Sequence, residues 1–339
     1  MDYQQAIKEV KHQTLQGVYC LQGSEDFLRQ EFRQSLAEAV EKAAGELDVV
    51  SFDLNEDSID AVLDEAETYS FFVDQRLIIA DQCDFLVSQP TQKLTDMQQE
   101  RLLDYLKNPN PASHILFIVP HDGVDKRRKL TKQFQKLAVY VNVSPLDEGA
   151  VGTYLNKYLQ EMQLDLNRAG QEALLQRVDY QLSQAVAEVQ KLKQYAQGGH
   201  PLTLEVVENL VTRSLASNVF DLTNAIVARK MEESVQIYQD LILMKNDPIQ
   251  LHALLVSQFR LYLQVKILVN QGLMQDEIGR SLGVHPYRVK LAMQASRRMN
   301  LKELSALYGQ FIEADRQMKT GSSMKETAFY IILTKIMQL

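Results

Sequence analysis

The 339-residue sequence contains no tryptophan, only two cysteines, eight prolines and 14 glycines. So few prolines and glycines exclude a collagen-like or low-complexity chain and leave little room for long flexible linkers. The two cysteines, Cys20 and Cys83, stand alone in apolar stretches, which excludes a disulfide framework and zinc-binding cysteine pairs. We expect two buried thiols in a reducing cytoplasm.

Long hydrophobic runs are missing as well. No apolar segment approaches the ~18 residues that a membrane-spanning helix needs, and residues 1–5 (MDYQQ) have neither the basic stretch nor the apolar run of a secretory signal. Hydrophobic residues make up 45% of the chain and charged residues 24%, which is typical of soluble globular proteins. We therefore expect a cytoplasmic protein of two or three domains with no membrane partner.

The phosphate-binding loop of ATPases is also incomplete. That loop needs the pattern G-x-x-x-x-G-K-[ST], because glycines let backbone amides approach the phosphates and the lysine reaches the γ-phosphate. The first apolar strand is instead followed by LQGSEDFL at 21–28, with one glycine and no lysine. Glu25 and Asp26 would repel a phosphate from the helix N-terminus, and we expect Ser24 to cap that helix. A later strand ends at Asp81 like a magnesium-binding strand, but Gln82 stands where a hydrolytic glutamate would be. The pattern predicts an ATPase-like architecture with a dismantled site.

Other catalytic patterns are missing too. The six histidines form no H-E-x-x-H motif, and the sequence has no G-x-S-x-G motif. His114 and His121 flank one apolar strand and could share a metal ion, although we favour two unrelated structural histidines. We expect no catalytic residue, no cofactor and no metal.

The first 145 residues alternate between strand and helix patterns. Short apolar strands separated by helices indicate a parallel sheet that is covered by helices on both faces. We predict strands at 17–21, 49–53, 76–81, 114–119 and 139–141, with helices near 24–44, 57–68, 92–107 and 125–137.

After Pro145 only helical patterns follow, with apolar residues three and four positions apart. The breaks are sparse: they lie at 198–201, 247–248, Gly272, Gly283 and Gly321. We predict an α/β plus all-α protein with an α/β domain at 1–145, a small helical domain at 146–213 and a helical bundle at 214–339.

The net charge of −8 conceals a gradient along the chain: −13 over residues 1–85, +4 over 86–145, −3 over 146–213 and +4 over 214–339. An acidic polymer such as DNA could therefore bind only at a local patch. One basic cluster contains no acidic residue, and three of its lysines share one helix face. We consider a solvated helix face the simpler interpretation and a contact with the DNA backbone the alternative. The cluster comprises Lys126, Arg127, Arg128, Lys129, Lys132 and Lys136.

A pair of aromatic residues, Phe71 and Phe72, lies in the segment EAETYSFFVDQRLII at 65–79. Composition alone favours ordinary core residues. However, neighbouring side chains diverge on either a helix or a strand, so one ring should point outward, and the acidic flanks place the pair near a surface. A paired aromatic at a solvated edge is typical of an anchor for a protein partner.

This segment, an acidic helix followed by a small-x-Phe tip and a basic residue that opens an apolar strand, resembles the δ subunit of the bacterial DNA polymerase III clamp loader, of the Gram-positive type. The resemblance extends in order along the whole chain. It includes GVYCLQGSE at 17–25, NVFDLTNAI at 218–226, and the stretches 258–261, 282–290, 313–315 and 319–321.

The resemblance implies a degenerate AAA+-like domain, a small lid domain and a collar domain that joins the loader pentamer. It implies a subunit that binds the sliding clamp (β) through a hydrophobic tip and helps open it for loading on primed DNA, while other subunits (τ/γ and δ′) hydrolyse ATP. It implies no catalysis by this chain, although the holoenzyme is a DNA-directed DNA polymerase, and a place in the nucleoid-associated replisome. The implied clamp-binding residues are Ser70, Phe71 and Phe72, flanked by Tyr69 and Val73.

A helix-turn-helix pattern at 275–290 supports a different function. Gly283 can close its first helix and Pro286 can open the second, so that Tyr287, Arg288 and Lys290 would enter a major groove. The alternative is thus a DNA-binding regulator. We favour helix packing, because the pattern lies inside a long helical run and the resemblance places it in the collar. A housekeeping ATPase is a weaker alternative.

Overall fold

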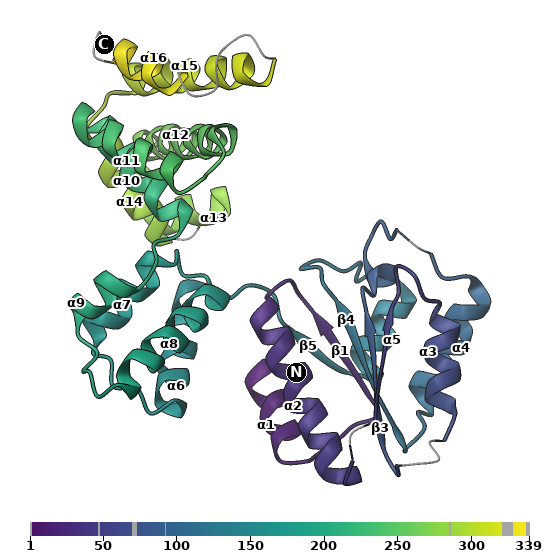
Figure 1. Cartoon of the computed structure of the whole chain (residues 1–339). Helices are drawn as coiled ribbons and strands as arrows, with labels where there is room; N and C mark the ends of the chain where they lie inside the picture. Colours follow the sequence, from purple (N-terminus) through teal and green to yellow (C-terminus); the bar gives the residue numbers. More distant parts are fainter. Residues whose placement is uncertain are drawn as a thin grey trace. The chain divides into compact units, whose positions relative to one another are not determined.

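The computed structural model describes residues 2–46, 48–69, 73–91, 93–284, 286–320 and 328–336. The chain divides into two compact units, residues 1–146 and 147–339 (Figure 1). The first contains the sheet, and the described part of the second is helical throughout, so the predicted succession of an α/β part and an all-α part is confirmed.

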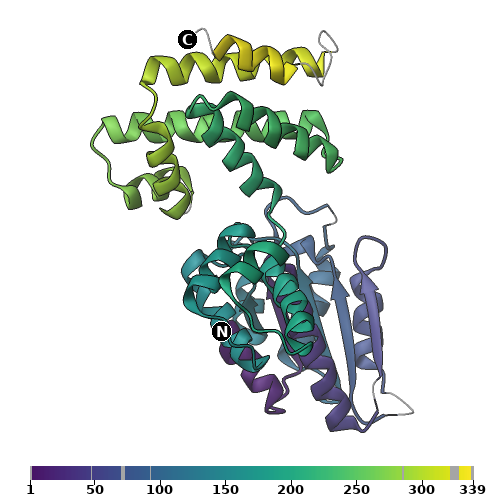
Figure 2. The same ribbon diagram turned by 60° about the vertical axis from the view of Figure 1, so that its left-hand side comes forward.

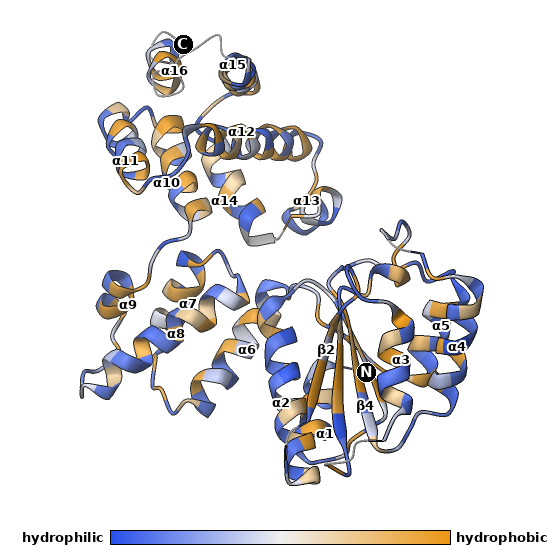
Figure 3. Cartoon of the chain, turned by 45° about the vertical axis from the view of Figure 1, so that its right-hand side comes forward, coloured by the Kyte–Doolittle hydropathy of each residue, from blue (hydrophilic) through white to orange (hydrophobic). Residues whose placement is uncertain are grey.

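The sheet of the first unit has five parallel strands in the order β2-β3-β4-β1-β5. Strands β1 and β4 are buried along their whole length, as expected for parallel strands with both faces covered. Figure 3, which is coloured by hydropathy, shows hydrophobic residues along the strands of the sheet. The strands are β1 (Val18–Gln22), β2 (Val49–Asp53), β3 (Arg76–Asp81), β4 (Ser113–Val119) and β5 (Val139–Asn142).

Helices α1 and α2 cover one face of this sheet, and α3, α4 and α5 cover the other (Figure 1). Rings of Phe85, Phe117 and Phe134 pack beneath the second layer, with the centroids of Phe117 and Phe134 5.2 Å apart. Both cysteines are buried. The helices are α1 (Tyr3–Lys11), α2 (Asp26–Ala44), α3 (Ile59–Glu67), the 3₁₀ turn η1 (Asp84–Leu86), α4 (Asp96–Lys107) and α5 (Lys129–Leu137).

The second unit begins with four helices, α6 (Glu148–Glu161), α7 (Arg168–Arg177), α8 (Leu182–Gln197) and α9 (Leu204–Leu210). Their buried leucines and valines face one another, for example Leu155, Leu174 and Val189. Whether these helices form a separate domain from those that follow stays a prediction.

In the rest of this unit α12 is contacted by α10, α13, α14 and α15, and α15 follows it along its length (Figure 2). Phe259 of α12 stacks on Phe311 of α15 with ring centroids 4.7 Å apart. Among the described residues, no helix is long and apolar enough to span a bilayer. The helices are α10 (Leu215–Val227), α11 (Met231–Leu243), α12 (Pro248–Asn270), α13 (Gln275–Leu282), α14 (Pro286–Ser296), α15 (Leu301–Lys319) and α16 (Ala328–Ile336).

Candidate functional site

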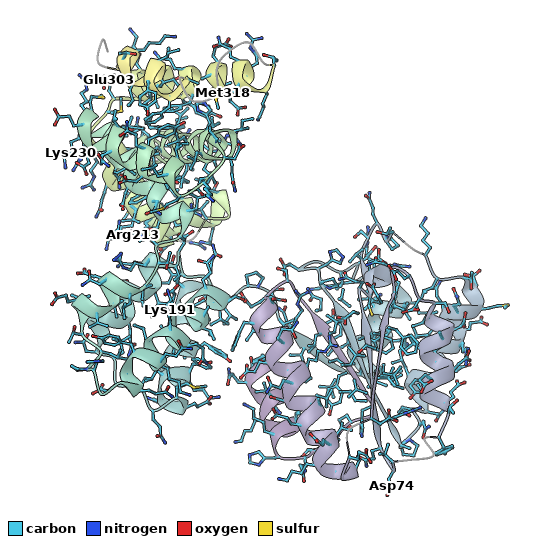
Figure 4. All side chains as sticks on the ribbon, in the orientation of Figure 1. Asp74, Lys191, Arg213, Lys230, Glu303 and Met318 are labelled. Atoms are coloured by element: carbon cyan, nitrogen blue, oxygen red, sulfur yellow. The ribbon has the colours of Figure 1, made fainter. Side chains whose placement is uncertain are left out.

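The candidate partner-binding segment connects α3 to β3 and lies at the edge of the sheet where the strands begin. Ser70, Phe71 and Phe72 lie outside the described residues. Tyr69 before them is 67% exposed, and Val73 after them is half-buried. Figure 4 labels Asp74, which is exposed at the same turn.

The helix that leads into this segment is held firmly against the sheet. The Ser58 hydroxyl accepts a hydrogen bond from the Ala61 amide and caps the start of α3. Ile59, Val62, Leu63 and Ala66 are buried, since their spacing places them on one face. At the other end, the Asn110 side chain donates to the Ala66 carbonyl at 3.0 Å.

Arg76, the first residue of β3, anchors the far side of the segment. Its side chain is only 11% exposed. Its Nε and Nη2 donate to Oδ2 of Asp48 at 3.0 and 2.8 Å, and Nη1 donates to Glu65 on α3. Hydrogen bonds between ionised groups are stronger than neutral ones. One guanidinium therefore joins the start of β3, the residue before β2 and the end of α3.

The acidic flank of the segment is also bound within the protein. Arg101 of α4 donates to Asp60, Asp64 and Glu67 of α3 at 3.3, 2.6 and 2.7 Å. The hydrogen bonds that Arg101 donates to Asp64 and Glu67 raise the pKa of Arg101 above its usual value. A single exposed ion pair contributes little, but this one cation serves three carboxylates. Helices α3 and α4 are therefore tied together beside the candidate segment.

His114, near the start of β4, supports the same edge. Its Nδ1 lies 2.8 Å from the Gln16 carbonyl and its Nε2 3.3 Å from Oε1 of Gln75. Burial lowers the pKa of His114, so the ring is neutral at pH 7. His121 is exposed beyond the other end of the strand, about 20 Å away at the ordinary rise per residue, so the two histidines cannot share a metal. Among the described residues, no group of three or more His, Cys, Asp and Glu side chains is placed to hold a metal ion.

At the opposite edge of the sheet the strands end, and an α/β protein would bind a nucleotide there. The site would lie between β1 and β4, because the connections that follow these two strands lead to opposite sides of the sheet. Here the Ser24 amide and hydroxyl both donate to the Asp122 carboxylate, each at 2.8 Å. The prediction that Ser24 caps α2 is wrong, because Glu25 is at the N-cap position and the Ser24 hydroxyl is bound to Asp122. A carboxylate of the protein thus binds the amide at the turn where a phosphate would bind.

The chain also packs closely against this turn. Gly23 has φ +145°, and a Cβ atom there would lie 2.1 Å from the Val143 carbonyl carbon and the Ser144 nitrogen. The Gly23 amide donates to Val119, and the Glu25 amide donates to Val143. Only glycine fits such an approach.

The end of β3 is engaged as well. Arg33 of α2 donates to Oδ2 of Asp81 at 3.1 Å. The carboxylate that was compared with a magnesium ligand is therefore in an ion pair with an arginine. Together with Asp122, this pair fills the carboxyl edge with the protein's own partners.

Two arginines of the predicted basic cluster make contacts within the protein. Arg127 pairs with Asp125 through two hydrogen bonds of 3.1 and 3.2 Å, and lowers the pKa of that carboxyl. Arg128 donates to the carbonyls of Phe85 and Val87. Asp125 and the carbonyls of Phe85 and Val87 therefore bind two of the six cations, and a contact of the cluster with DNA stays a prediction. The exposed members are the lysines Lys126, Lys129, Lys132 and Lys136.

The predicted helix-turn-helix is present as α13 and α14, joined at Gly283, whose φ of +63° is left-handed. Its second helix packs into the bundle, because Val289, Ala292 and Ala295 are buried in the core that surrounds α12. Arg288 lies 3.9 Å from Asp179, and Lys290 is exposed. The side chain of Tyr287 lies outside the described residues. Packing accounts for the pattern, and no finding supports the DNA-binding regulator.

Sequence reasoning missed two features of the site. It noted Arg76 only as a basic residue before a strand, and it did not anticipate the role of Arg101. Neither set of partners is adjacent in sequence: Arg76 lies 28 residues from Asp48, and Arg101 lies 41 residues from Asp60. The acidic run at 60–67 was the available signal that a cation must lie nearby.

Comparisons with known proteins show which family the sequence matches. A family model described as DNA polymerase III, delta subunit matches residues 19–144, and a model of the C-terminal domain of the same subunit matches residues 216–336. The DNA polymerase III subunit delta of Bacillus subtilis is 33% identical over 332 residues, which cover 98% of this chain and 96% of the relative. A probable DNA polymerase III subunit delta of Aquifex aeolicus is 24% identical over 84% of this chain and 81% of its own length.

Among solved structures, the DNA clamp loader delta protein of Bacillus subtilis superposes with a TM-score of 0.72 at 32% identity, and the match covers 99% of this chain and all of that one. This confirms the degenerate AAA+-like α/β unit followed by helices. The two family models together span most of the sequence, and the Bacillus relative matches nearly all of it. The chain belongs to the DNA polymerase III delta subunit family.

Proposed function

We propose that this chain acts in the clamp loader as the subunit that binds the sliding clamp, helps to open it for loading on primed DNA, and leaves ATP hydrolysis to other subunits. The observation that carries the proposal is an aromatic segment at 69–73, between elements joined by Arg76 and Arg101, in a chain of this family. Because these arginines fix the ends of α3 and β3 that flank the segment, the flanking backbone does not have to be ordered on binding, so more of the contact energy appears as affinity.

In this proposal Phe71 and Phe72 enter an apolar pocket on the clamp, Ser70 lets the chain approach closely, and Tyr69 and Val73 cover the rim. Aromatic anchors that fill a pocket carry most of the energy of an interface, and truncating one costs ~2 kcal/mol or more. Asp64 and Glu67 at the base of the segment already bind Arg101, so these carboxylates are not available to basic groups of the clamp.

The assembly with the other loader subunits is part of the same proposal. Residues 214–339 would form the collar that joins them, with the τ/γ and δ′ subunits as neighbours, in the cytoplasm at the nucleoid. The closed carboxyl edge of the sheet, with Ser24 on Asp122 and Arg33 on Asp81, supports a subunit that depends on its neighbours for nucleotide chemistry.

The four exposed lysines between the η1 turn and α5 are the proposed contact with the DNA backbone inside the assembled loader. Each phosphate contact adds close to one unit to the slope of log affinity against log salt. Changing Lys129, Lys132 and Lys136 to Gln should therefore lower the salt dependence of DNA binding by the loader. Arg127→Gln is the matched control, because Arg127 is already paired with Asp125. If the salt slope of DNA binding is equal in all variants, these lysines form a solvated surface that does not contact DNA.

The clamp proposal is tested by titrating a purified sliding clamp with the full chain and with its Phe71→Ala/Phe72→Ala variant. We expect the double variant to bind at least about 30-fold more weakly. Leu243→Ala/Met244→Ala is the control, because these side chains are 79% and 67% exposed in the second unit. Unchanged affinity in a normally melting Phe71→Ala/Phe72→Ala variant would refute the proposal.

A further inference from the structure

An open groove of about 710 Å³ lies directly beside the proposed clamp-binding segment. Its walls are the end of α3, the outer face of α4 and the turn at 108–111. The residues that concern the groove's chemistry are Tyr69, Glu67, Met97, Glu100, Arg101 and Asp104.

The outer face of α4 carries an exposed apolar side chain among charged ones. Met97, Glu100, Arg101 and Asp104 are spaced i, i+3, i+4 and i+7, so they share one face, while Leu102 and Leu106 on the other face are buried. Met97 is 79% exposed. Its thioether is flexible and polarizable, which suits a contact with a partner surface more than a solvated helix face.

Tyr69 and Met97 are the two most exposed large apolar side chains among the described residues of the α/β unit, and both line this groove. The other two in that unit, Val49 and Leu137, are only 37% and 36% exposed. Exposed apolar groups that gather in one place on an otherwise polar surface mark an interaction site.

The rim of the groove is acidic. Glu67 shares the guanidinium of Arg101 with Asp60 and Asp64, and Asp104 pairs with Lys107 at 2.8 Å. Glu100 is exposed and makes no ion pair with any other described residue. A partner that places an apolar group on Met97 would therefore find a complementary position for a basic group at Glu100.

We propose that this groove is a second contact for the sliding clamp: it receives the clamp surface that borders the pocket for Phe71 and Phe72, with an aliphatic side chain against Tyr69 and Met97 and a lysine or arginine against Glu100. The inference rests on the proposed function and extends it. The groove includes Tyr69, the residue that precedes the aromatic pair, and Arg101 joins the two helices that line it, so a clamp that binds Phe71 and Phe72 would also lie against the groove.

Clamp titrations with the full chain test the groove separately from the segment. Met97→Ala should weaken clamp binding by about threefold to tenfold, and Glu100→Gln should weaken it and flatten its salt dependence. Met274→Ala, a 71% exposed methionine in the second unit, should leave the affinity unchanged. Because all three side chains are exposed, the variants should melt like the wild type.

Oxidation footprinting of the unmodified chain gives a second measurement. Peroxide converts exposed methionines to sulfoxides, so bound clamp should slow oxidation at Met97 and leave Met274 unaffected. If the Phe71→Ala/Phe72→Ala variant loses binding but Met97→Ala and Glu100→Gln bind like the wild type and Met97 is not protected, the groove proposal is overturned and the clamp function stands. If the Phe71→Ala/Phe72→Ala variant binds normally, the proposed function itself fails.

Discussion

Replacing Arg76 by alanine should loosen the base of the proposed clamp-binding segment by a predictable amount. The guanidinium, 11% exposed, is lost from between Asp48 and Glu65, whose side chains are 26% and 32% exposed. A hydrogen bond to a charged group contributes ~1.5–3 kcal/mol. Because both carboxylates are partly exposed, we expect the loss of the Arg76 contacts to cost ~2 kcal/mol, in the lower half of this range. This corresponds to about a 30-fold increase in the equilibrium constant for local opening at the start of β3.

Hydrogen exchange of the full chain measures this opening at the start of β3. The Arg76 amide donates to Ala112 and the Leu77 amide to Asp48, at 3.0 and 2.9 Å, so both report directly on this edge. Their exchange should accelerate about 30-fold in Arg76→Ala. Clamp affinity should fall as well, although Phe71 and Phe72 are unchanged, because the start of β3, which flanks the segment, would have to be ordered on binding.

The control is Arg127→Ala, which removes an arginine–carboxylate pair whose arginine side chain is 89% exposed. It should leave exchange in β3 unchanged. If Arg76→Ala also exchanges like the wild type, Arg76 does not hold this edge and the rigid-base argument fails. If exchange accelerates but clamp affinity is normal, the rigidity exists and binding does not depend on it.

Three further outcomes follow from the site. Burial lowers the pKa of His114, so the unfolded chain takes up that proton first, whereas the raised pKa of Glu148 (about 8) acts in the opposite direction; the loss of urea midpoint between pH 7.5 and 5.5 should therefore be smaller in His114→Gln than in the wild type, and an equal loss would contradict this sign. Gly23→Ala should lower the melting temperature strongly, since its Cβ would overlap the backbone at 143–144, and a normal melt would refute that packing. Asp122→Ala should speed exchange of the Ser24 amide without creating affinity for a fluorescent ATP analogue; tight nucleotide binding would show that one carboxylate alone blocks the site.

Local patterns were enough to predict the alternation of strands and helices in the first unit, because each strand is a short apolar run between turn residues. Helix α1 is not among the predicted elements. Its signal was nevertheless present: Tyr3, Ala6, Ile7 and Val10 are buried on one face, and Asp2 accepts from the Gln4 amide as an N-cap.

The contacts that organise the site could not be predicted, because each joins residues far apart in sequence. Ser24 before a helix favours an N-cap by local propensity, yet Asp122, 98 positions later, binds its hydroxyl. In the same way, the basic run at 126–129 favours a solvated helix face by local pattern, yet the carbonyls of Phe85 and Val87, more than 40 positions earlier, accept from Arg128. In both cases a contact with residues distant in sequence determines what the side chain binds.

The two edges of the sheet explain how an ATPase-like architecture can serve as a binding module. At the carboxyl edge, Ser24 binds Asp122 and Arg33 binds Asp81, so these four side chains already have partners within the protein. At the amino edge, Arg76 joins the start of β3 to Asp48 and to Glu65 at the end of α3, the two elements that flank the aromatic segment. The hydrogen-bonded strands connect the two edges. In the proposed function, the change driven by ATP therefore comes from neighbouring subunits, and it would move this unit, together with the base of the aromatic segment, as one body.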